Sequence, residues 1–375
     1  MKKVVIAIDS FKGCLPSAEA GKAAAEGIRS VYPECEVICL PIADGGEGML
    51  DVLIMATNGQ EVPISAHDPL MRWCNTYYGI SENGETAFIE MASISGLPLV
   101  PPERRNPMLT TTYGTGEIIR DALERGCRNF IIGIGGSATN DAGLGMLQAL
   151  GFRFSDKEGK EVGTGRGEVL IKVAHIDSTC VHPALNSCRF TVACDVQNPF
   201  YGPEGAAYVF APQKGADREM VEALDAGLQN FAEVIRHTTG KDISHHPGAG
   251  AAGGMGGSLL AFLNAELKPG IQLMLEALDF SNKIKSADLI ITGEGKADRQ
   301  TLMGKVPSGI LAEARKQNIP VILLAGNIED SDELQQAGFE GVFSVNPPFI
   351  SLEEAMRPEV ACKNIQQTVE SICKK

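Results

Sequence analysis

The sequence predicts an α/β protein of two domains, one built from both ends of the chain around a parallel sheet and one inserted between them. Apolar, strand-like runs alternate with helical segments at the start of the chain; this pattern changes near residue 68 and returns near residue 286. The chain has 375 residues, which suggests two or three domains at ~150 residues each. We therefore expect a discontinuous domain of residues 1–68 plus 286–375 and an inserted mixed α/β domain of residues 69–285.

Continuous apolar strands joined by helices define the discontinuous domain. Such strands are typical of a parallel sheet that is covered on both faces, so we expect a Rossmann-like α/β fold here. The expected strands are 3–8, 37–41, 288–291, 321–325 and 341–345, and the expected helices are 17–29, 49–55 and 307–317.

The inserted domain begins with a hairpin signal. Two β-like runs, 73–80 and 86–92, are separated by a segment that contains Asn83-Gly84, a dipeptide that favours tight hairpin turns. Farther on, apolar residues recur at helical spacing over 218–237. We also expect a helix at 116–125, strands at 129–134 and 190–194, and a helix that opens in the glycine-rich loop 133–141 and ends near residue 150.

Composition and charge exclude several classes of protein. Lys and Arg number 33 and Asp and Glu 47, a net charge of −14 that opposes binding to nucleic acid. No apolar stretch approaches the ~18 residues of a membrane span, and the apolar run 4–8 is too short for a signal sequence. The ten cysteines are scattered, without CxxC or zinc-like spacing. We therefore expect a cytoplasmic protein with reduced thiols that binds neither nucleic acid nor membranes.

Glycine is unusually frequent: there are 42, roughly 11% of the chain against a usual ~7%. The loop GIGGSATND (133–141) follows a predicted strand, and a helix that opened there would present free N–H groups to a phosphate. GAGAAGGMGG (248–257) and TGEG (292–295) are further glycine-rich segments. The candidate nucleotide-binding residues are Gly135, Gly136, Ser137, Asn140, Gly253, Gly254, Gly256, Gly293 and Gly295.

Two other interpretations of the 133–141 loop stay open. The run also fits a loose G-x-G-x-x-A pattern with Asp156 about 20 residues on, which is the arrangement of a dinucleotide-binding site. Alternatively, glycine there serves only the packing of a tight corner. Asn140-Asp141 would put a carboxylate in the first turn of the helix, where it would repel a pyrophosphate unless a metal intervened, so Asp141 becomes a candidate metal ligand.

Acidic residues follow several of the predicted strands. Ligands of open parallel sheets bind at the carboxyl ends of the strands, where carboxylates can hold Mg²⁺ or accept a hydroxyl proton. No Walker A or protein-kinase signature is present. The acidic candidates are Asp9, Asp44, Asp195, Glu294 and Asp298.

Catalytic, metal-binding and substrate-binding roles are predicted for several of these acidic residues and for cationic or polar residues near them. Asp195, which ends the strand 190–194, and the cation Lys12 are predicted to be catalytic; Asp195 acts as base or metal ligand, or it only caps a turn. Asp298 is assigned to metal, together with Asp141. The predicted substrate-binding residues are Ser10, Asp44 and Arg105.

Together these segments resemble the bacterial type-1 glycerate kinase family along essentially the whole chain. The resemblance implies ATP-dependent phosphorylation of D-glycerate to 2-phosphoglycerate and ADP, with Mg²⁺, in a cleft between two α/β domains. The chain departs from the family pattern at Met49, Ala142 and Lys296. The matching segments are DSFKG (9–13), ADGGEG (43–48), IEMASISGL (89–97), TTYGTGE (111–117), GIGGSATND (133–141), CDVQNP (194–199), PQKGA (212–216), GAGAAGGMG (248–256), ITGEG (291–295) with Asp298 and Gln300, and GKVP (304–307).

Other functions remain as alternatives at this point. One is an NAD(P)-dependent dehydrogenase of a small hydroxy acid, one is a nucleotide-binding module without catalysis, and one is phosphorylation at the 3-hydroxyl of glycerate. The expected partners are glycerate and ATP. The sequence leaves open whether the protein is a monomer or a homodimer.

Overall fold

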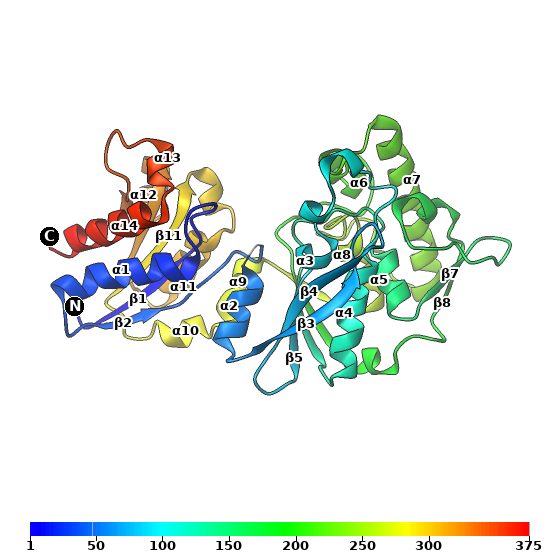
Figure 1. Ribbon diagram of the computed structural model, residues 1–375, viewed down its shortest axis with the longest axis horizontal. Coiled ribbons are helices and arrows are strands. Elements are labelled where there is room, and N and C mark those ends of the chain that lie inside the picture. Colours follow the sequence, from blue (N-terminus) through cyan, green and yellow to red (C-terminus); the bar gives the residue numbers. More distant parts are fainter. Residues whose placement is uncertain (47, 375) are drawn as a thin grey trace. The chain divides into compact units, whose positions relative to one another are not determined.

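A computed structural model describes residues 1–46 and 48–374 of the chain, which divide into two compact units (Figure 1). The first unit consists of residues 1–44 and the chain from Ile271 onward, and the second is Gly45–Gly270. The predicted class, two α/β parts with the first built from both chain ends, is confirmed. The boundaries lie earlier than the expected positions 68 and 286.

The first boundary lies earlier because the helix expected at 49–55, which is α2 (Met49–Ala56), belongs to the second unit and not to the first. The strand β3 (Gln60–His67) follows it there. It pairs antiparallel with β4 (Trp73–Ile80) along its whole length, so it belongs to the sheet of the second unit. This strand was not predicted from the sequence. Exposed and partly buried residues alternate with its few buried ones, so it lacks the continuous apolar run that marks the strands of the first unit.

The sheet of the first unit is fully parallel, with the order β13-β12-β11-β1-β2. Numbered within this sheet alone, the order is 2-1-3-4-5, in which the direction of strand addition reverses between β1 and β11. Loops that leave the carboxyl ends of two such strands diverge and leave a crevice. The strands are β1 (Lys3–Ile8), β2 (Glu36–Cys39), β11 (Leu289–Ala297), β12 (Val321–Ile328) and β13 (Gly341–Ser344).

Helices cover both faces of this sheet. α1 (Ser17–Val31) and α14 (Pro358–Cys373) lie side by side, near the two chain ends in Figure 1, and share one apolar core with β1, β11 and β12. α11 (Val306–Lys316) also contacts these three strands, and Pro307 stands at its start as predicted. The remaining helices are α9 (Gly270–Ala277), α10 (Phe280–Lys283), α12 (Ser331–Gln336) and α13 (Leu352–Ala355).

The second unit contains a six-stranded mixed sheet with the order β10-β9-β6-β5-β4-β3. Its first four strands are parallel, and β4 and β3 extend it in antiparallel fashion. The predicted hairpin is present, with Gly84 at a φ of +74° in its turn. The parallel strands are β5 (Thr86–Glu90), β6 (Asn129–Gly133), β9 (Arg189–Ala193) and β10 (Glu266–Lys268).

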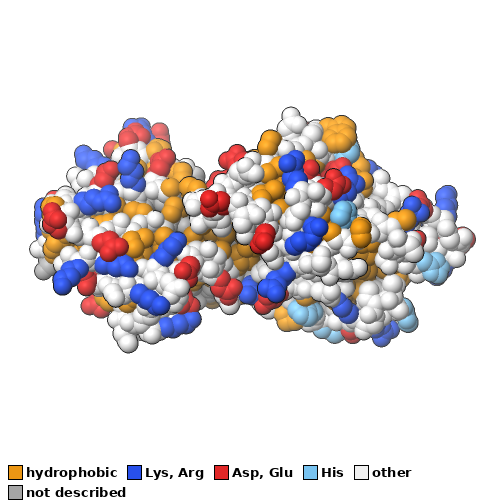
Figure 2. Space-filling view, turned by 90° about the horizontal axis from the view of Figure 1, so that it is seen from below, with side chains coloured by type: hydrophobic (Ala, Val, Ile, Leu, Met, Phe, Trp, Pro, Cys, Tyr) orange, Lys and Arg blue, Asp and Glu red, His pale blue; other side chains and the backbone are white. Residues whose placement is uncertain are grey.

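The helices of the second unit pack around one apolar core. In α7 (Arg218–Thr239) the predicted apolar stripe is buried. The other elements are α2 (Met49–Ala56), α3 (Ala92–Ser95), α4 (Tyr113–Glu124), α5 (Leu144–Ala149), α6 (Ala206–Phe210), α8 (Met255–Phe262) and the short strands β7 (Arg153–Ser155) and β8 (His175–Asp177). On the face shown in Figure 2, Lys and Arg side chains lie among Asp and Glu side chains.

Candidate functional site

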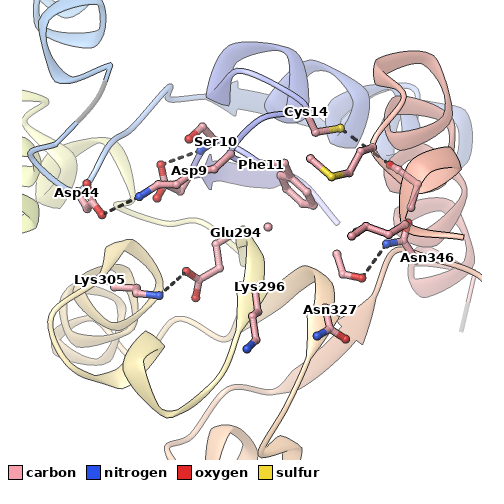
Figure 3. Close-up of a pocket in the computed structure, with 16 residues that line it drawn as sticks. Asp9, Ser10, Phe11, Cys14, Asp44, Glu294, Lys296, Lys305, Asn327 and Asn346 are labelled. Carbon is pink, nitrogen blue, oxygen red and sulfur yellow. Dashed lines mark hydrogen bonds and ion pairs between the residues drawn. The ribbon is translucent and has the colours of Figure 1, made fainter. Parts of the chain in front are cut away.

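A pocket of about 400 Å³ lies in the first unit at the point where strand order reverses (Figure 3). The loop that follows β1 folds back on itself, since Phe11 and Leu15 form a short bridge and Gly13 between them has a φ of +74°. Residues from this loop and from β11 face the pocket. Its walls are Asp9, Ser10, Phe11, Lys12, Cys14, Asp44, Glu294, Gly295, Lys296, Lys305, Gly326, Asn327, Asn346, Leu352, Ala355 and Met356.

Two buried carboxylates form the acidic part of this pocket. Asp9 is 6% exposed, and one of its oxygens accepts the backbone N–H of Ser10 at 2.7 Å. Burial raises the pKa of Asp9 to about 7, and the nearby Asp44 carboxylate also raises it. Burial likewise raises the pKa of Glu294, which accepts a hydrogen bond from the hydroxyl of Thr301. Asp9 can therefore accept or release a proton near neutral pH.

Lysines face these carboxylates. Lys305 Nζ lies 3.5 Å from an oxygen of Glu294, and Lys12 Nζ lies 3.9 Å from an oxygen of Asp44. The Lys12 side chain is 71% exposed, so it remains available to a ligand. A pocket that holds carboxylates and lysines together can bind a charged ligand and move a proton.

The predicted residues of the first unit fall into two groups. Ser10, Lys12, Asp44 and Gly295 line the pocket. Gly293 does not: it lies inside β11, where an added Cβ would come within 2.5 Å of the Leu324 carbonyl oxygen, so this glycine serves strand packing.

Asp298 does not line the pocket either. It caps the short 3₁₀ helix Arg299–Leu302, accepts the N–H of Gln300 at 2.9 Å and lies 3.5 Å from Lys296 Nζ. Asp298 therefore has a structural role as a helix cap and ion-pair partner, whereas the sequence had suggested a metal ligand.

In the second unit, a hollow of about 470 Å³ has six glycines among its thirteen lining residues. Gly135 and Gly136 are exposed and line it, together with Gly45, Gly46 and Gly133. Backbone exposed in this way lets a ligand approach closely. The carboxylates of two other wall residues, Asp51 and Glu90, give the hollow a partly acidic wall.

The loop 133–141 does not open a helix directly, which corrects the expectation. α5 begins at Leu144, so Asp141 lies before the helix and is fully buried. Its carboxylate accepts four hydrogen bonds, from the N–H and the hydroxyl of Thr112 and from the N–H groups of Gly143 and Gly145. These bonds anchor the loop and do not fit the assignment of Asp141 as a metal ligand.

Gly253, Gly254 and Gly256 are all buried. Gly253 lies against Thr139 and Asn140 of this loop and Gly254 against Ala142, whereas Gly256 lies against Gly248. At Gly253, where φ is +68°, an added Cβ would lie 2.1 Å from the Thr139 carbonyl oxygen. The close approach explains why this segment is rich in glycine. Gly253 and Gly254 therefore pack against the end of the loop 133–141, and the burial of all three glycines does not fit the predicted contact with nucleotide.

Asp195 follows β9 and is exposed. One of its oxygens accepts the backbone N–H of Gly270 at 2.8 Å. Gly270 is the first residue of α9 and the last residue of the second unit. This contact is a structural role, as in the alternative prediction that Asp195 only caps a turn. The alternative had expected the cap on the turn directly after Asp195, whereas the partner is Gly270.

Lys214 is a buried cation that was not predicted from the sequence. It is 3% exposed, and its Nζ donates to the Ser137 hydroxyl at 2.8 Å and to the Thr139 carbonyl at 2.6 Å. Burial lowers its pKa to about 7, against the opposing effect of Asp141. Its only signal in the sequence was its place in the segment PQKGA, because a lysine between Gln213 and Gly215 shows nothing of its burial. The predicted residue Arg105 lies against Gly215.

Within residues 1–46 and 48–374, no group of three or more His, Cys, Asp or Glu side chains is arranged to hold a metal ion. All ten cysteines are free thiols. Among the helices in the same described ranges, none combines the length and the apolar character needed to cross a membrane.

Comparisons with known proteins agree along the full length. The sequence model of the Glycerate kinase family matches residues 4–375. The chain is 46% identical over 371 residues to a glycerate kinase of Bacillus subtilis, covering 99% of this chain and 96% of that protein. It is 48% identical over 356 residues to a glycerate 2-kinase of Escherichia coli K12, covering 95% and 93%. A crystal structure from Salmonella typhimurium LT2, assigned as glycerate kinase 2, is 44% identical with a TM-score of 0.91, covering 100% of this chain and 97% of that one.

Proposed function

Because the chain belongs to the glycerate kinase family, we propose that it transfers the γ-phosphoryl group of ATP to the 2-hydroxyl of D-glycerate, giving 2-phosphoglycerate and ADP. Its similarity to the E. coli glycerate 2-kinase, 48% over 95% of this chain, supports this regiochemistry. We further propose that the reaction takes place in the cytoplasm, and that glycerate and ATP are the partners of the protein.

The observation that carries the proposal is the pocket at the reversal point of the parallel sheet. Enzymatic phosphoryl transfer depends on positioning and on charge stabilisation, and it uses a carboxylate to orient the acceptor hydroxyl and cations to neutralise phosphate oxygens. Asp9 and Lys12 supply these two kinds of group in one pocket. We place the proton-accepting carboxylate at Asp9 in preference to Asp195, because Asp9 is buried with a pKa of about 7 while Asp195 is exposed and holds Gly270.

Mg²⁺ fits the chemistry of this pocket better than it fits Asp141 or Asp298. Asp44 and Glu294 both raise the pKa of Asp9, which reflects repulsion among carboxylates that a divalent cation would offset. Mg²⁺ in kinases is bound by one or two carboxylates together with the nucleotide phosphates, so a complete protein cage is not required. When bound, Mg²⁺ neutralises phosphate charge, and Asp44 is the carboxylate that we assign to hold it.

A coupled assay of ADP release tests the proposal. The purified protein is incubated with ATP, Mg²⁺ and, in turn, D-glycerate, L-glycerate, glycolate or lactate, and the product is identified by ³¹P NMR. We expect ADP release that depends on D-glycerate and yields 2-phosphoglycerate. The 3-phosphate as sole product would overturn the regiochemistry. Oxidation of a hydroxy acid with NAD(P)⁺, without ADP release, would establish the dehydrogenase alternative.

A further inference from the structure

Buried polar atoms without partners are concentrated in one region of the second unit. Among the described residues, six buried side-chain nitrogen or oxygen atoms make no hydrogen bond. Five of the six belong to four residues: Arg105 Nε, Thr139 Oγ1, Asn140 Nδ2 and Oδ1, and Arg166 Nε. A buried polar atom left without a partner destabilises the fold, because it has lost its hydrogen bonds to water. The concentration of such atoms in one region makes it the strongest candidate in the second unit for contact with a ligand.

Backbone contacts bring these four residues together around the end of the loop 133–141. An added Cβ on Gly215 would lie 2.3 Å from the Arg105 carbonyl oxygen, so Arg105 lies beside Lys214 in the chain fold. An added Cβ on Gly167 would lie 3.1 Å from the Asn140 carbonyl oxygen, so Arg166 is next to Asn140. On the other side of Arg166, an added Cβ on Gly165 would lie 2.6 Å from the backbone nitrogen of Gly145, in the segment that follows Asp141.

Lys214 adds a third cationic group to this set. Its two hydrogen bonds, to Ser137 and Thr139, join it to the same loop. Among the ion pairs of the described residues, none includes Arg105, Arg166 or Lys214. The carboxylate that acts on Lys214 is Asp141, whose own oxygens are occupied by four other donors.

We propose that Arg105, Arg166 and Lys214, with the side-chain amide of Asn140, form a binding site for an oxyanion group of the substrates. The proposal rests on the proposed kinase function for its two sources of oxyanion, the carboxylate of glycerate and a phosphate of ATP. The guanidinium group presents donors in a planar fork that matches carboxylate and phosphate alike. Such a ligand would give the orphaned donors their partners and would balance the positive charge that Asp141 leaves uncompensated.

Arg166→Gln is the first variant to test, because Arg166 is only partly buried and the fold is expected to tolerate the change. Arg105→Gln and Lys214→Met follow. Arg125→Gln is the matched arginine control, since Arg125 makes an exposed ion pair with Asp121. Lys241→Met is the matched lysine control, because Lys241 also donates to backbone carbonyls in the same unit. Thermal unfolding of each variant establishes that it is folded.

Dissociation constants for D-glycerate and for ATP–Mg²⁺ are measured by isothermal titration calorimetry. We expect each of the three site variants to weaken one of these ligands on the order of 10- to 100-fold, as the loss of a charge-assisted hydrogen bond implies, with both controls at the wild-type value. Weaker glycerate binding identifies the carboxylate as the occupant, and weaker ATP binding identifies a phosphate. Unchanged affinity for both ligands in a folded Arg166→Gln protein overturns the proposal.

Inorganic phosphate separates this proposal from the proposed function. If the wild-type protein does not phosphorylate glycerate, the kinase function fails, but the oxyanion site is still tested by the thermal stabilisation that inorganic phosphate gives. We expect that stabilisation in the wild type and in both controls, and its loss in Arg166→Gln. Equal stabilisation of the wild type and Arg166→Gln would overturn the site whatever the reaction.

Discussion

The pocket of the first unit and the proposed oxyanion site of the second unit, called the cluster below, differ in how their charges are balanced. In the pocket, each of the three lysines has a carboxylate within 4 Å: Lys305 with Glu294, Lys12 with Asp44 and Lys296 with Glu329. In the cluster, made of Arg105, Asn140, Arg166 and Lys214, the cations form no ion pair with another described residue, and the side-chain donors Arg105 Nε, Arg166 Nε and Asn140 Nδ2 make no hydrogen bond. Paired charges stabilise each other with or without a ligand, whereas a buried donor without a partner lowers stability until a ligand binds it. The cluster is therefore the more specific sign of ligand recognition.

Burial shifts the pKa of one group in each region, upward in the pocket and downward in the cluster. Burial disfavours the charged form of any group, so it raises the pKa of Asp9 and lowers the pKa of Lys214, in each case to about 7. Asp9 thereby gains the ability to exchange a proton at neutral pH. Lys214 becomes a cation whose charge a bound anion would stabilise.

The largest effect that we expect comes from Asp9→Asn, which preserves the shape of the side chain and removes its charge. If Asp9 accepts the glycerate proton, kcat should fall on the order of 10²-fold or more, because positioned proton transfer contributes about that factor. Steady-state kinetics at saturating Mg²⁺ measure the loss.

Asp195→Asn is the matched comparison for that variant, and we expect a much smaller change in kcat together with a modest loss of stability. A near-normal kcat for Asp9→Asn, with a 10²-fold loss for Asp195→Asn, would return the catalytic role to Asp195. Restoration of Asp9→Asn activity at high Mg²⁺ would show that Asp9 is a metal ligand and not the base.

The second prediction concerns stability and pH at Lys214. Its pKa is about 7 in the folded protein, below the ~10.4 of an unfolded chain, so between these values the unfolded state binds more protons. The free energy of unfolding should therefore rise with pH across this window, by up to about 1.4 kcal/mol per pH unit from this group. Lys214→Met should abolish that rise. Urea unfolding at pH 7 and pH 9 measures the difference between the two proteins, and an identical pH dependence would show that Lys214 is charged in the fold.

A smaller effect is expected from Lys12→Met in the pocket of the first unit. Lys12 is largely exposed, and its Nζ lies as far as 3.9 Å from the Asp44 carboxylate, so solvent screens this ion pair. We expect a rise in the glycerate KM or a fall in kcat of several-fold, with no change in thermal stability. Lys22→Met, on the exposed side of α1, is the control. Wild-type kinetics for Lys12→Met would show that Lys12 is a solvated loop residue.

The smallest effect is expected from Asp298→Asn. The amide keeps an oxygen that can accept the N–H of Gln300, so the cap of the 3₁₀ helix Arg299–Leu302 survives while the charge is lost. We expect nearly unchanged kcat and an unchanged Mg²⁺ requirement. A tenfold higher Mg²⁺ requirement would restore Asp298 as the metal ligand, against the assignment to Asp44.

The local sequence was sufficient to predict a strand, helix or turn whose own residues carry a clear pattern of apolar or turn-forming side chains. The strand 3–8 was predicted to the residue. It is covered on both faces, so every residue after Lys3 is apolar and buried. The stripe of α7 and the Asn83-Gly84 turn were found for the same reason. β3 was missed because a strand of a mixed sheet that is only partly covered carries a weaker pattern.

The chemistry of individual side chains was decided by tertiary structure. From the sequence, Asp141 was a candidate metal ligand and Lys214 went unnoticed, yet both are buried together at the base of one loop. Local spacing could not show this, because the donors that occupy Asp141 include Thr112, 29 residues away, and the hydroxyl that Lys214 bonds is 77 residues away. By itself, then, the sequence determined the fold class and the glycerate kinase resemblance. Which polar groups are buried, paired or left open to a ligand depends on contacts between distant segments, and desolvation acts on a side chain only once those segments have packed.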